Sequence, residues 1–160
     1  MINSRIIKFG NNIDTDQIIP AQYLRLETII DMAPYTFLHD KNFTENFKEG
    51  FIIVGDENFG CGSSREQAPA VLRDRGVTAI IAKSFARIFY RNAINLGILL
   101  IKCSSTNEFS NLDEISIDLN KDAIVNLSTN RTYSFEPFPI FILNILKAGG
   151  IVAYKTRIVK

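Results

Sequence analysis

The middle of the sequence alternates apolar runs of strand length with segments of helical spacing. Three continuous apolar runs lie at residues 51–54 (FIIV), 78–82 (TAIIA) and 98–101 (ILLI). Apolar residues at helical spacing occupy the intervals at residues 67–74 and 85–96, and Gly76 and Gly97 mark their ends. Strands that alternate with helices are typical of parallel sheets with crossover helices, so this part of the chain predicts a parallel α/β unit.

Further elements are predicted on both sides of this unit. Residues 5–9 are a predicted first strand, and residues 14–26 a short turn or helix followed by a loop, broken by Pro20. Three short strands in a meander are predicted at residues 115–119, 123–127 and 131–135. A short helix is predicted at residues 42–49 and a last helix at residues 137–147. We therefore expect a single layered α/β domain over residues 1–160, with a mixed, partly parallel sheet.

Composition excludes several classes of function. The 18 Lys and Arg residues nearly balance 17 Asp and Glu residues, so no excess charge favours nucleic acid or an anionic membrane. The apolar runs are far shorter than the roughly 20 residues of a membrane span, and the N-terminus lacks the apolar core of a secretory signal. Two cysteines, Cys61 and Cys103, are too few for an iron–sulfur cluster, which takes about four. With a single histidine, His39, a structural zinc site is not expected either, and we expect a cytoplasmic protein that binds no metal itself.

The stretch GCGSSREQAP, residues 60–69, is the strongest candidate for a functional loop. It follows one predicted strand and precedes a helix, and ligands bind at the ends of such strands in α/β sheets. Gly60 and Gly62 permit a sharp bend and a close approach to a ligand. Amides at a helix N-terminus favour an anion, and Arg65 can hold a carboxylate through two hydrogen bonds.

Other interpretations of this loop remain open at this stage. Ser63 and Glu66 have the spacing of a capping box, but a helix begun at Ser63 would carry Pro69 in its interior, at a cost of about 3 kcal/mol. A helix begun near Glu66 places Pro69 in the first turn and leaves Ser63, Ser64 and Arg65 in a loop. A phosphate loop of the GxGxxG type is disfavoured because Arg65 occupies the place of the third glycine. Spacing alone leaves an anion site and a helix cap equally open.

Other charged residues are weaker candidates. Asp14 and Asp16 precede a short predicted helix, where acidic residues usually act as caps. Arg25 stands between two leucines in a predicted loop, either as a substrate clamp or, more commonly, as a solvated side chain. Lys83, Arg87 and Arg91 either form a basic rim around an anion pocket or lie on a solvated helix face.

Three ordered motifs resemble the swivelling domain of the aconitase superfamily. The motifs are GNNIDTDQIIPAQYLR (residues 10–25), GDENFGCGSSREQAP (55–69) and AIIAKSFARIFYRNAINLGILLI (79–101). The resemblance covers about residues 5–102 and is far more specific than a lone GxG. At this length the chain is similar to the family of free-standing small subunits of 3-isopropylmalate dehydratase.

This resemblance implies a layered β/β/α swivelling domain and a hydro-lyase that is active only with a partner. The family isomerises a hydroxy-di- or tricarboxylate by dehydration and rehydration, and the isopropylmalate branch serves leucine biosynthesis. A [4Fe–4S] cluster with one open iron binds the substrate hydroxyl and a carboxylate. That cluster belongs to a separate large subunit, so the resemblance implies a heterodimer or heterotetramer and no cofactor on this chain.

The resemblance also assigns roles to single residues. Ser63 is implied as the base that removes the substrate proton, Ser64 as a group that orients it or binds substrate, and Arg65 as the holder of a substrate carboxylate. Arg25 falls in the loop that tunes substrate choice. A serine hydroxyl is a poor base, so its anion needs stabilisation by backbone amides and nearby cations.

Related substrates and other classes of function are the alternatives. The small subunit of homoaconitase or of a methylmalate-type dehydratase fits the same motifs, because Arg25 suits an additional carboxylate while Leu24 and Leu26 suit an isopropyl group. Cys61 stands where aconitase carries glutamate, which favours the isopropylmalate branch. Two alternatives come from other classes of function. The chain could be a stand-alone phosphate- or nucleotide-binding module, or a subunit that serves assembly alone.

Overall fold

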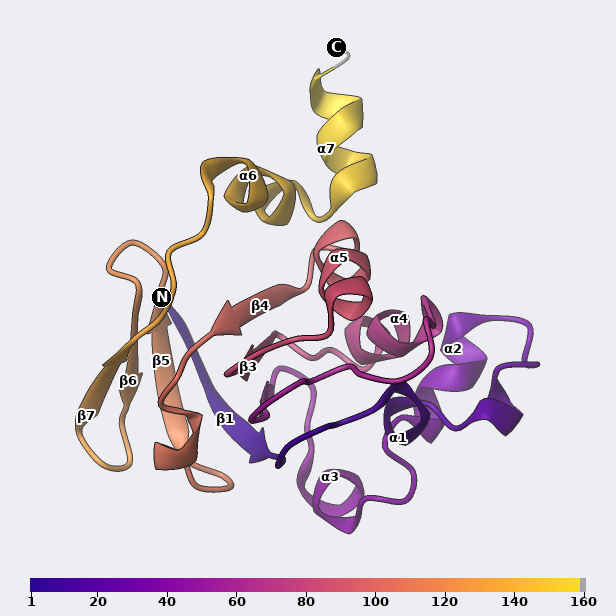
Figure 1. Cartoon of the computed structure of the whole chain (residues 1–160), viewed down its shortest axis with the longest axis horizontal. Coiled ribbons are helices and arrows are strands. Elements are labelled where there is room, and N and C mark those ends of the chain that lie inside the picture. Colours follow the sequence, from indigo (N-terminus) through magenta and orange to yellow (C-terminus); the bar gives the residue numbers. More distant parts are fainter. Residues whose placement is uncertain (159–160) are drawn as a thin grey trace.

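A single mixed sheet organises the chain, with strand order β4-β3-β2-β1-β5-β6-β7 (Figure 1). The computed structural model describes residues 1–158. The parallel strands are β1 (Ile2–Lys8), β2 (Ile52–Val54), β3 (Ala79–Ala82) and β4 (Leu99–Lys102). The antiparallel part, which starts from the other edge of β1, contains β5 (Glu114–Asp118), β6 (Ala123–Asn126) and β7 (Arg131–Ser134).

Neighbouring residues of the parallel strands face two different cores. Ile7, Ile53 and Ile80 belong to the core shared with the helices. Their neighbours, which include Ile6 and Ile52, belong to a second core that is closed by apolar residues of β5 and β6. Because side chains alternate across a strand, this two-sided burial explains why the parallel strands are continuous apolar runs. The predicted layered β/β/α class with a mixed sheet is confirmed.

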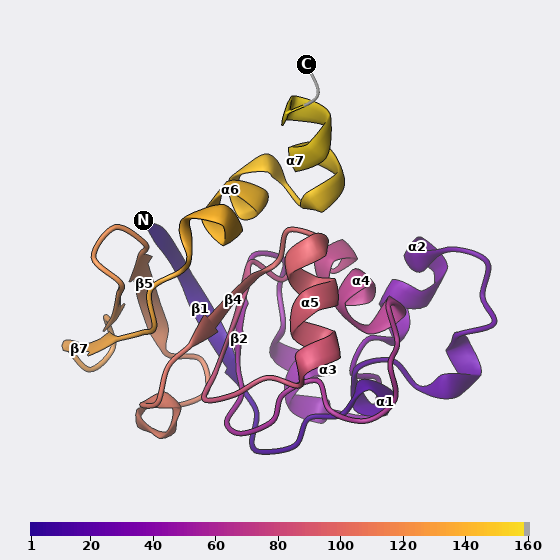
Figure 2. The ribbon, with the colours of Figure 1, turned by 45° about the horizontal axis from the view of Figure 1, so that its top comes forward.

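The first five helices cover the face of the parallel strands away from β5 to β7, and the last two lie beside the fifth (Figures 1 and 2). The helices are α1 (Thr15–Ile18), α2 (Ile29–Met32), α3 (Lys41–Asn46), α4 (Gln67–Asp74), α5 (Arg87–Asn95), α6 (Ile140–Ala148) and α7 (Ile151–Ile158). Short 3-10 turns lie at η1 (Ala21–Tyr23), η2 (Ala33–Tyr35) and η3 (Thr106–Glu108). Among residues 1–158, no helix has the length and apolar character needed to cross a membrane.

The predicted helix at residues 67–74 is confirmed with its bounds, and Pro69 lies in its first turn. The prediction that the helix at 137–147 is the last one was wrong, because α7 begins directly after Gly150. A glycine pair ends a helix but does not prevent a new one, and Gly149 takes the left-handed conformation that separates the two. Figure 2 shows α7 projecting away from the sheet.

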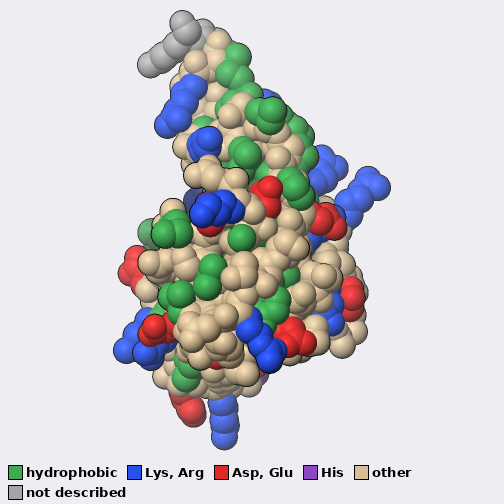
Figure 3. Space-filling model, turned by 90° about the vertical axis from the view of Figure 1, so that its left-hand side faces the viewer, with side chains coloured by type: hydrophobic (Ala, Val, Ile, Leu, Met, Phe, Trp, Pro, Cys, Tyr) green, Lys and Arg blue, Asp and Glu red, His purple; other side chains and the backbone are tan. Residues whose placement is uncertain are grey.

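Charges of both signs are mixed over the surface. Figure 3 views the molecule from the side of β5 to β7, and acidic and basic side chains are interspersed on that face. This agrees with the net charge of +1. The charge distribution on this face therefore favours neither a positively nor a negatively charged partner.

Two turns that are far apart in the sequence meet without intervening side chains. Gly97, after α5, has φ +83°, and a Cβ added to it would lie 2.7 Å from the carbonyl carbon of Gly149. Gly150 approaches the carbonyl oxygen of Asn95 equally closely, at 2.6 Å from its hypothetical Cβ. The C-terminal helices are thus held against α5 by backbone contact that only glycine permits.

Gly97→Ala is expected to lower the free energy of unfolding by about 1–3 kcal/mol, because alanine meets both a left-handed conformation and a backbone contact. Chemical denaturation measures the effect. The matched control is Gly10→Ala, since a Cβ at Gly10 has no atom within 4 Å and Gly10 does not adopt a positive φ. Equal stability of the two variants would contradict this packing.

Candidate functional site

The loop between β2 and α4 is held by backbone hydrogen bonds on both sides. On one side the Gly60 amide donates to the Ile13 carbonyl at 2.7 Å. On the other side the Phe59 amide donates to the Ser84 carbonyl at 3.0 Å, and the Ala86 amide donates to the Phe59 carbonyl at 2.9 Å. The neighbouring segments follow β1 and β3, so the carboxyl ends of three adjacent parallel strands build one site, where α/β sheets bind ligands.

Gly60 is required at the base of this loop. It has φ +81°, and a Cβ placed there would lie 2.2 Å from the ring of Phe89 on α5. Phe89 itself is buried in the core shared with the helices. The loop therefore lies directly on the first turn of α5. Any residue other than glycine at position 60 would require the loop or Phe89 to move.

Thr15 holds the segment that carries the two serines. Its side chain is buried, with 2% of the residue exposed, and its hydroxyl donates to the Ser63 carbonyl at 2.9 Å. The Thr15 amide donates to the Cys61 carbonyl at 2.9 Å. With the backbone fixed in this way, Ser63 and Ser64 lie exposed.

The capping-box interpretation of Ser63 and Glu66 was wrong. Helix α4 begins at Gln67 with Glu66 as its N-cap, and no side chain caps it. The capping box of this region lies at Asp14 and Gln17, which bond each other's backbone at the start of α1. Asp14 is thus a cap, as expected, and Ser63 is left unused by the helix.

A pocket of about 200 Å³ opens between the loop and α5. Its lining includes Thr15, Gly60, residues 62–65, residues 86–89 and Asn92. Helix α5 begins without a side-chain cap, and its first residues line this pocket. Helix α4 also lacks a side-chain cap, but the residues at its start, Glu66 and Gln67, line a neighbouring groove. Unpaired amides at helix N-termini carry partial positive charge, and the pocket therefore favours an anion.

Arg65 lies at the pocket with one side of its guanidinium fixed. Its side chain is 14% exposed, and Nη1 donates to Asp16 Oδ1 at 2.5 Å and to the Ile19 carbonyl at 3.2 Å. Within residues 1–158, Nε and Nη2 have no hydrogen-bond partner. The fixed edge orients the guanidinium and the other donors remain for an anionic ligand.

Other predicted residues are arranged less closely around the pocket. Arg25 is exposed in the loop after η1, where its Nε donates to the Gln22 carbonyl at 3.0 Å, and it lies outside the set of pocket-lining residues. Of the proposed basic rim, Arg87 lines the pocket, whereas Lys83 and Arg91 do not. His39 is exposed and lies outside this pocket.

Neither cysteine has the environment of a reactive thiolate or of a cluster ligand. Burial and the nearby Asp14 carboxylate raise the pKa of the Cys61 thiol, and burial raises the pKa of Cys103. Both thiols are free. Within residues 1–158, no group of three or more His, Cys, Asp and Glu side chains is arranged to hold a metal ion. The described residues therefore do not fit an iron–sulfur cluster.

Asp56 anchors the start of the loop. Its carboxylate accepts hydrogen bonds from Lys8 Nζ at 2.8 Å and from Thr106 Oγ1 at 2.5 Å. Burial alone would raise the pKa of this carboxyl, but these hydrogen bonds and the charges of Lys8 and Lys83 outweigh it and lower the pKa. The ion pair with Lys8 is largely shielded from solvent, with side-chain exposures of 18% and 19%.

Sequence reasoning missed the parts of the site that come from distant segments. Asp16 was considered only as one of a carboxylate pair or as a helix cap, and Thr15 was not singled out. Thr15 in fact holds the Ser63 backbone, and Asp16 lies inside α1 and holds Arg65. Asn92 gave no signal, because a polar residue on a helix is usually solvated. The motif containing Thr15 and Asp16 was the one available hint, since it was part of the family resemblance.

Comparison with known proteins agrees with this geometry. The family described as aconitase C-terminal domain matches residues 11–106. A 3-isopropylmalate dehydratase small subunit of Aquifex aeolicus is 47% identical over 94% of this chain and 91% of its own length. The isopropylmalate/citramalate isomerase small subunit of Methanocaldococcus jannaschii is 46% identical over 96% of this chain and 93% of its own length. The crystal structure of 3-isopropylmalate dehydratase from the same organism superposes with a TM-score of 0.92 at 46% identity, over 98% of this chain and 93% of that one.

The fold and the loop at the strand ends thus define an aconitase-type C-terminal domain. Within that superfamily, the chain belongs to the family of 3-isopropylmalate dehydratase small subunits. The resemblance inferred from the three motifs is confirmed. Its relatives are subunits of dehydratases, which are hydro-lyases.

Asp56→Asn is expected to lower the free energy of unfolding at pH 7 by about 1–3 kcal/mol, because it removes a charged hydrogen-bond acceptor. The pKa of Asp56 is lowered by folding, so its contribution is present at neutral pH and is lost as the pH falls below about 4. Denaturation curves of both proteins should therefore converge in acid.

The control is Glu114→Gln, which removes an exposed ion pair with Arg5 and is expected to cost little. Equal stability of Asp56→Asn and the parent chain at pH 7 would show that this carboxylate does not anchor the loop.

Proposed function

We propose that this chain is the small subunit of a 3-isopropylmalate dehydratase, which interconverts 2-isopropylmalate and 3-isopropylmalate by dehydration and rehydration in leucine biosynthesis. The observation that carries the proposal is the position of Ser63. Its side chain is exposed at an anion-favouring pocket and its backbone is held by the buried Thr15. The family membership supports the reaction class.

Ser63 is proposed as the catalytic base. Dehydration breaks a C–H bond and the C–O bond of the neighbouring carbon, and rehydration forms both bonds again with the two carbons exchanged. In the first half the Ser63 alkoxide accepts the carbon's proton, and the departing hydroxide would be taken up on the side of the pocket that the large subunit closes. In the second half Ser63 returns the proton to one carbon and the hydroxide adds to the other. The alkoxide form of Ser63 is stabilised by the positive end of α5 and by the Arg65 guanidinium, because both line the same pocket.

Arg65, Ser64 and Arg25 are proposed to bind substrate. The donors Nε and Nη2 of Arg65 suit a substrate carboxylate, since Asp16 already fixes Nη1. Ser64 lines the same pocket and offers a hydroxyl to a second polar group of the substrate. Arg25, on the exposed loop that follows η1, is proposed to set the choice of substrate rather than to act on the reacting carbons.

The proposed enzyme needs a second subunit. Because residues 1–158 contain no group of side chains arranged to hold a metal cluster, the [4Fe–4S] cluster is assigned to a large iron–sulfur subunit, in a heterodimer or heterotetramer. Residues 1–160 are proposed to act as one swivelling unit that closes over that subunit. The free thiols Cys61 and Cys103 suit a reducing compartment, so we propose a cytoplasmic location.

A related substrate is the second candidate. The relative from Methanocaldococcus jannaschii is named for both isopropylmalate and citramalate, and citramalate is the methylmalate-type alternative considered from the sequence; homoaconitate is the third. Leu24 and Leu26 flank Arg25 and are partly buried against the core, and the part of each that stays exposed is proposed to contact an aliphatic substituent. Turnover of all three substrates by the reconstituted pair decides between them.

Ser63→Ala is expected to lower kcat of the reconstituted enzyme by about 10²–10⁴-fold, the range that a positioned base contributes. Thermal unfolding and affinity for the large subunit should stay unchanged, because the Ser63 side chain is exposed. The control Ser104→Ala changes another exposed serine, after β4, and should leave turnover intact. A fully active Ser63→Ala enzyme would remove Ser63 from the mechanism.

Arg65→Lys is expected to lower kcat/KM by about 10- to 100-fold, because lysine keeps the charge but cannot hold both Asp16 and a carboxylate through a planar fork. Steady-state kinetics of the reconstituted pair measures this. Arg131→Lys, at an exposed ion pair on β7, is the same substitution away from the site and should have no effect. Unchanged kinetics of Arg65→Lys would mean that the fork is not used.

A further inference from the structure

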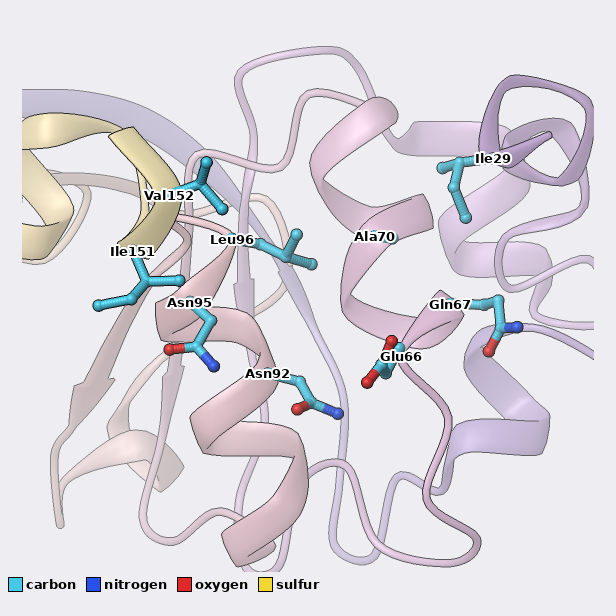
Figure 4. Close-up of a pocket in the computed structure, with 9 residues that line it drawn as sticks. All are labelled: Ile29, Glu66, Gln67, Ala70, Asn92, Asn95, Leu96, Ile151 and Val152. Atoms are coloured by element: carbon cyan, nitrogen blue, oxygen red, sulfur yellow. The ribbon is translucent and has the colours of Figure 1, made fainter. Parts of the chain in front are cut away.

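An apolar groove continues from the Ser63 pocket between α4 and α5. It has a volume of about 440 Å³, and its lining includes Ile29, Ala70, Leu96, Ile151 and Val152. Figure 4 shows Leu96 at the end of α5 pointing toward Ala70 on α4, with the two α7 residues at the left of the groove and Ile29 at the right. Four separate helices thus contribute apolar side chains to one depression.

The groove and the Ser63 pocket form one surface. Asn92 lines both of them, and Arg65 of the pocket is followed directly by Glu66 of the groove. Exposed apolar side chains continue on both sides, with Ile88 at the pocket and Ile30 beside Ile29. An apolar surface of this extent next to a functional site is a mark of protein association.

Helix α7 forms one wall of the groove although it is hardly buried by its own chain. None of its residues is buried, and Val152 is 76% exposed. Such a side chain leaves apolar surface in water, and a partner that covers it gains the free energy of its burial. The glycine contacts between Gly97 and Gly149 fix the position of this wall relative to α5.

We infer that this groove is the docking surface for the large iron–sulfur subunit, which inserts an apolar segment between α2 and α7. The inference rests on the proposed function. The Ser63 pocket lacks a metal centre among the described residues, so in the proposed enzyme it must face the subunit that holds the cluster. A surface continuous with that pocket then lies at the same interface. Asn92, Asn95 and Gln67 at the groove supply hydrogen bonds that fix the register of the inserted segment.

The test measures affinity between the full-length small subunit and its own large subunit by titration calorimetry. Val152→Asp places a charge on an exposed wall of the groove, and Asn95→Arg fills it from an exposed position on α5. Each variant is expected to raise Kd about tenfold or more, as loss of a buried apolar contact does. Lost activity should return as the small-subunit concentration is raised. Leu127→Asp, at an exposed leucine after β6, is the control and should leave Kd unchanged.

The outcomes separate this inference from the proposed function. If both groove variants bind like the parent chain while Ser63→Ala has lost turnover, the groove is not the docking surface and the function stands. If the groove variants instead abolish self-association of the small subunit in ultracentrifugation and keep their affinity for the large subunit, the occupant is a second copy and the inference is wrong. If the parent chain binds no large subunit, both fail.

Discussion

The backbone hydrogen bonds that join residues 59–61 to the segments on either side are the interaction on which the site depends. They join the loops after three parallel strands into one rigid edge, with Ile13 and Thr15 on one side and Ser84 on the other. Gly60 allows this edge to rest on Phe89. Because the backbone is fixed, the exposed Ser63 keeps its place without using its side chain, and that hydroxyl remains available for chemistry.

The site is also electrostatically prepared before any ligand arrives. Helix α5, whose first turn lines the pocket, begins without a side-chain cap, although Asp40 shows that this chain does cap a helix that begins away from the pocket. Asp16 fixes one edge of Arg65 and directs its other donors. Preorganised dipoles of this kind stabilise developing charge without reorganisation cost. A weak base such as serine needs such surroundings to act as one.

Local patterns predicted the parts of the fold that depend on neighbouring residues. The helix at Gln67–Asp74 followed from apolar spacing and from the cost of Pro69 in a helix interior, and the parallel unit followed from alternating elements. The contacts that complete the site join residues 48 or 49 positions apart, as in Thr15 with Ser63 and Asp16 with Arg65, and no local pattern carries them. Helix α7 was missed because a glycine pair indicates an end and does not indicate a restart.

We propose that Ser63 accepts the proton in a pocket that a second subunit completes. A crystal structure of the reconstituted pair with bound substrate would measure the distance from Ser63 Oγ to the carbon that loses its proton. We expect about 3–3.5 Å, the separation of reacting atoms in a productive complex. A structure in which that hydroxyl points to solvent, with another side chain against the carbon, would contradict it.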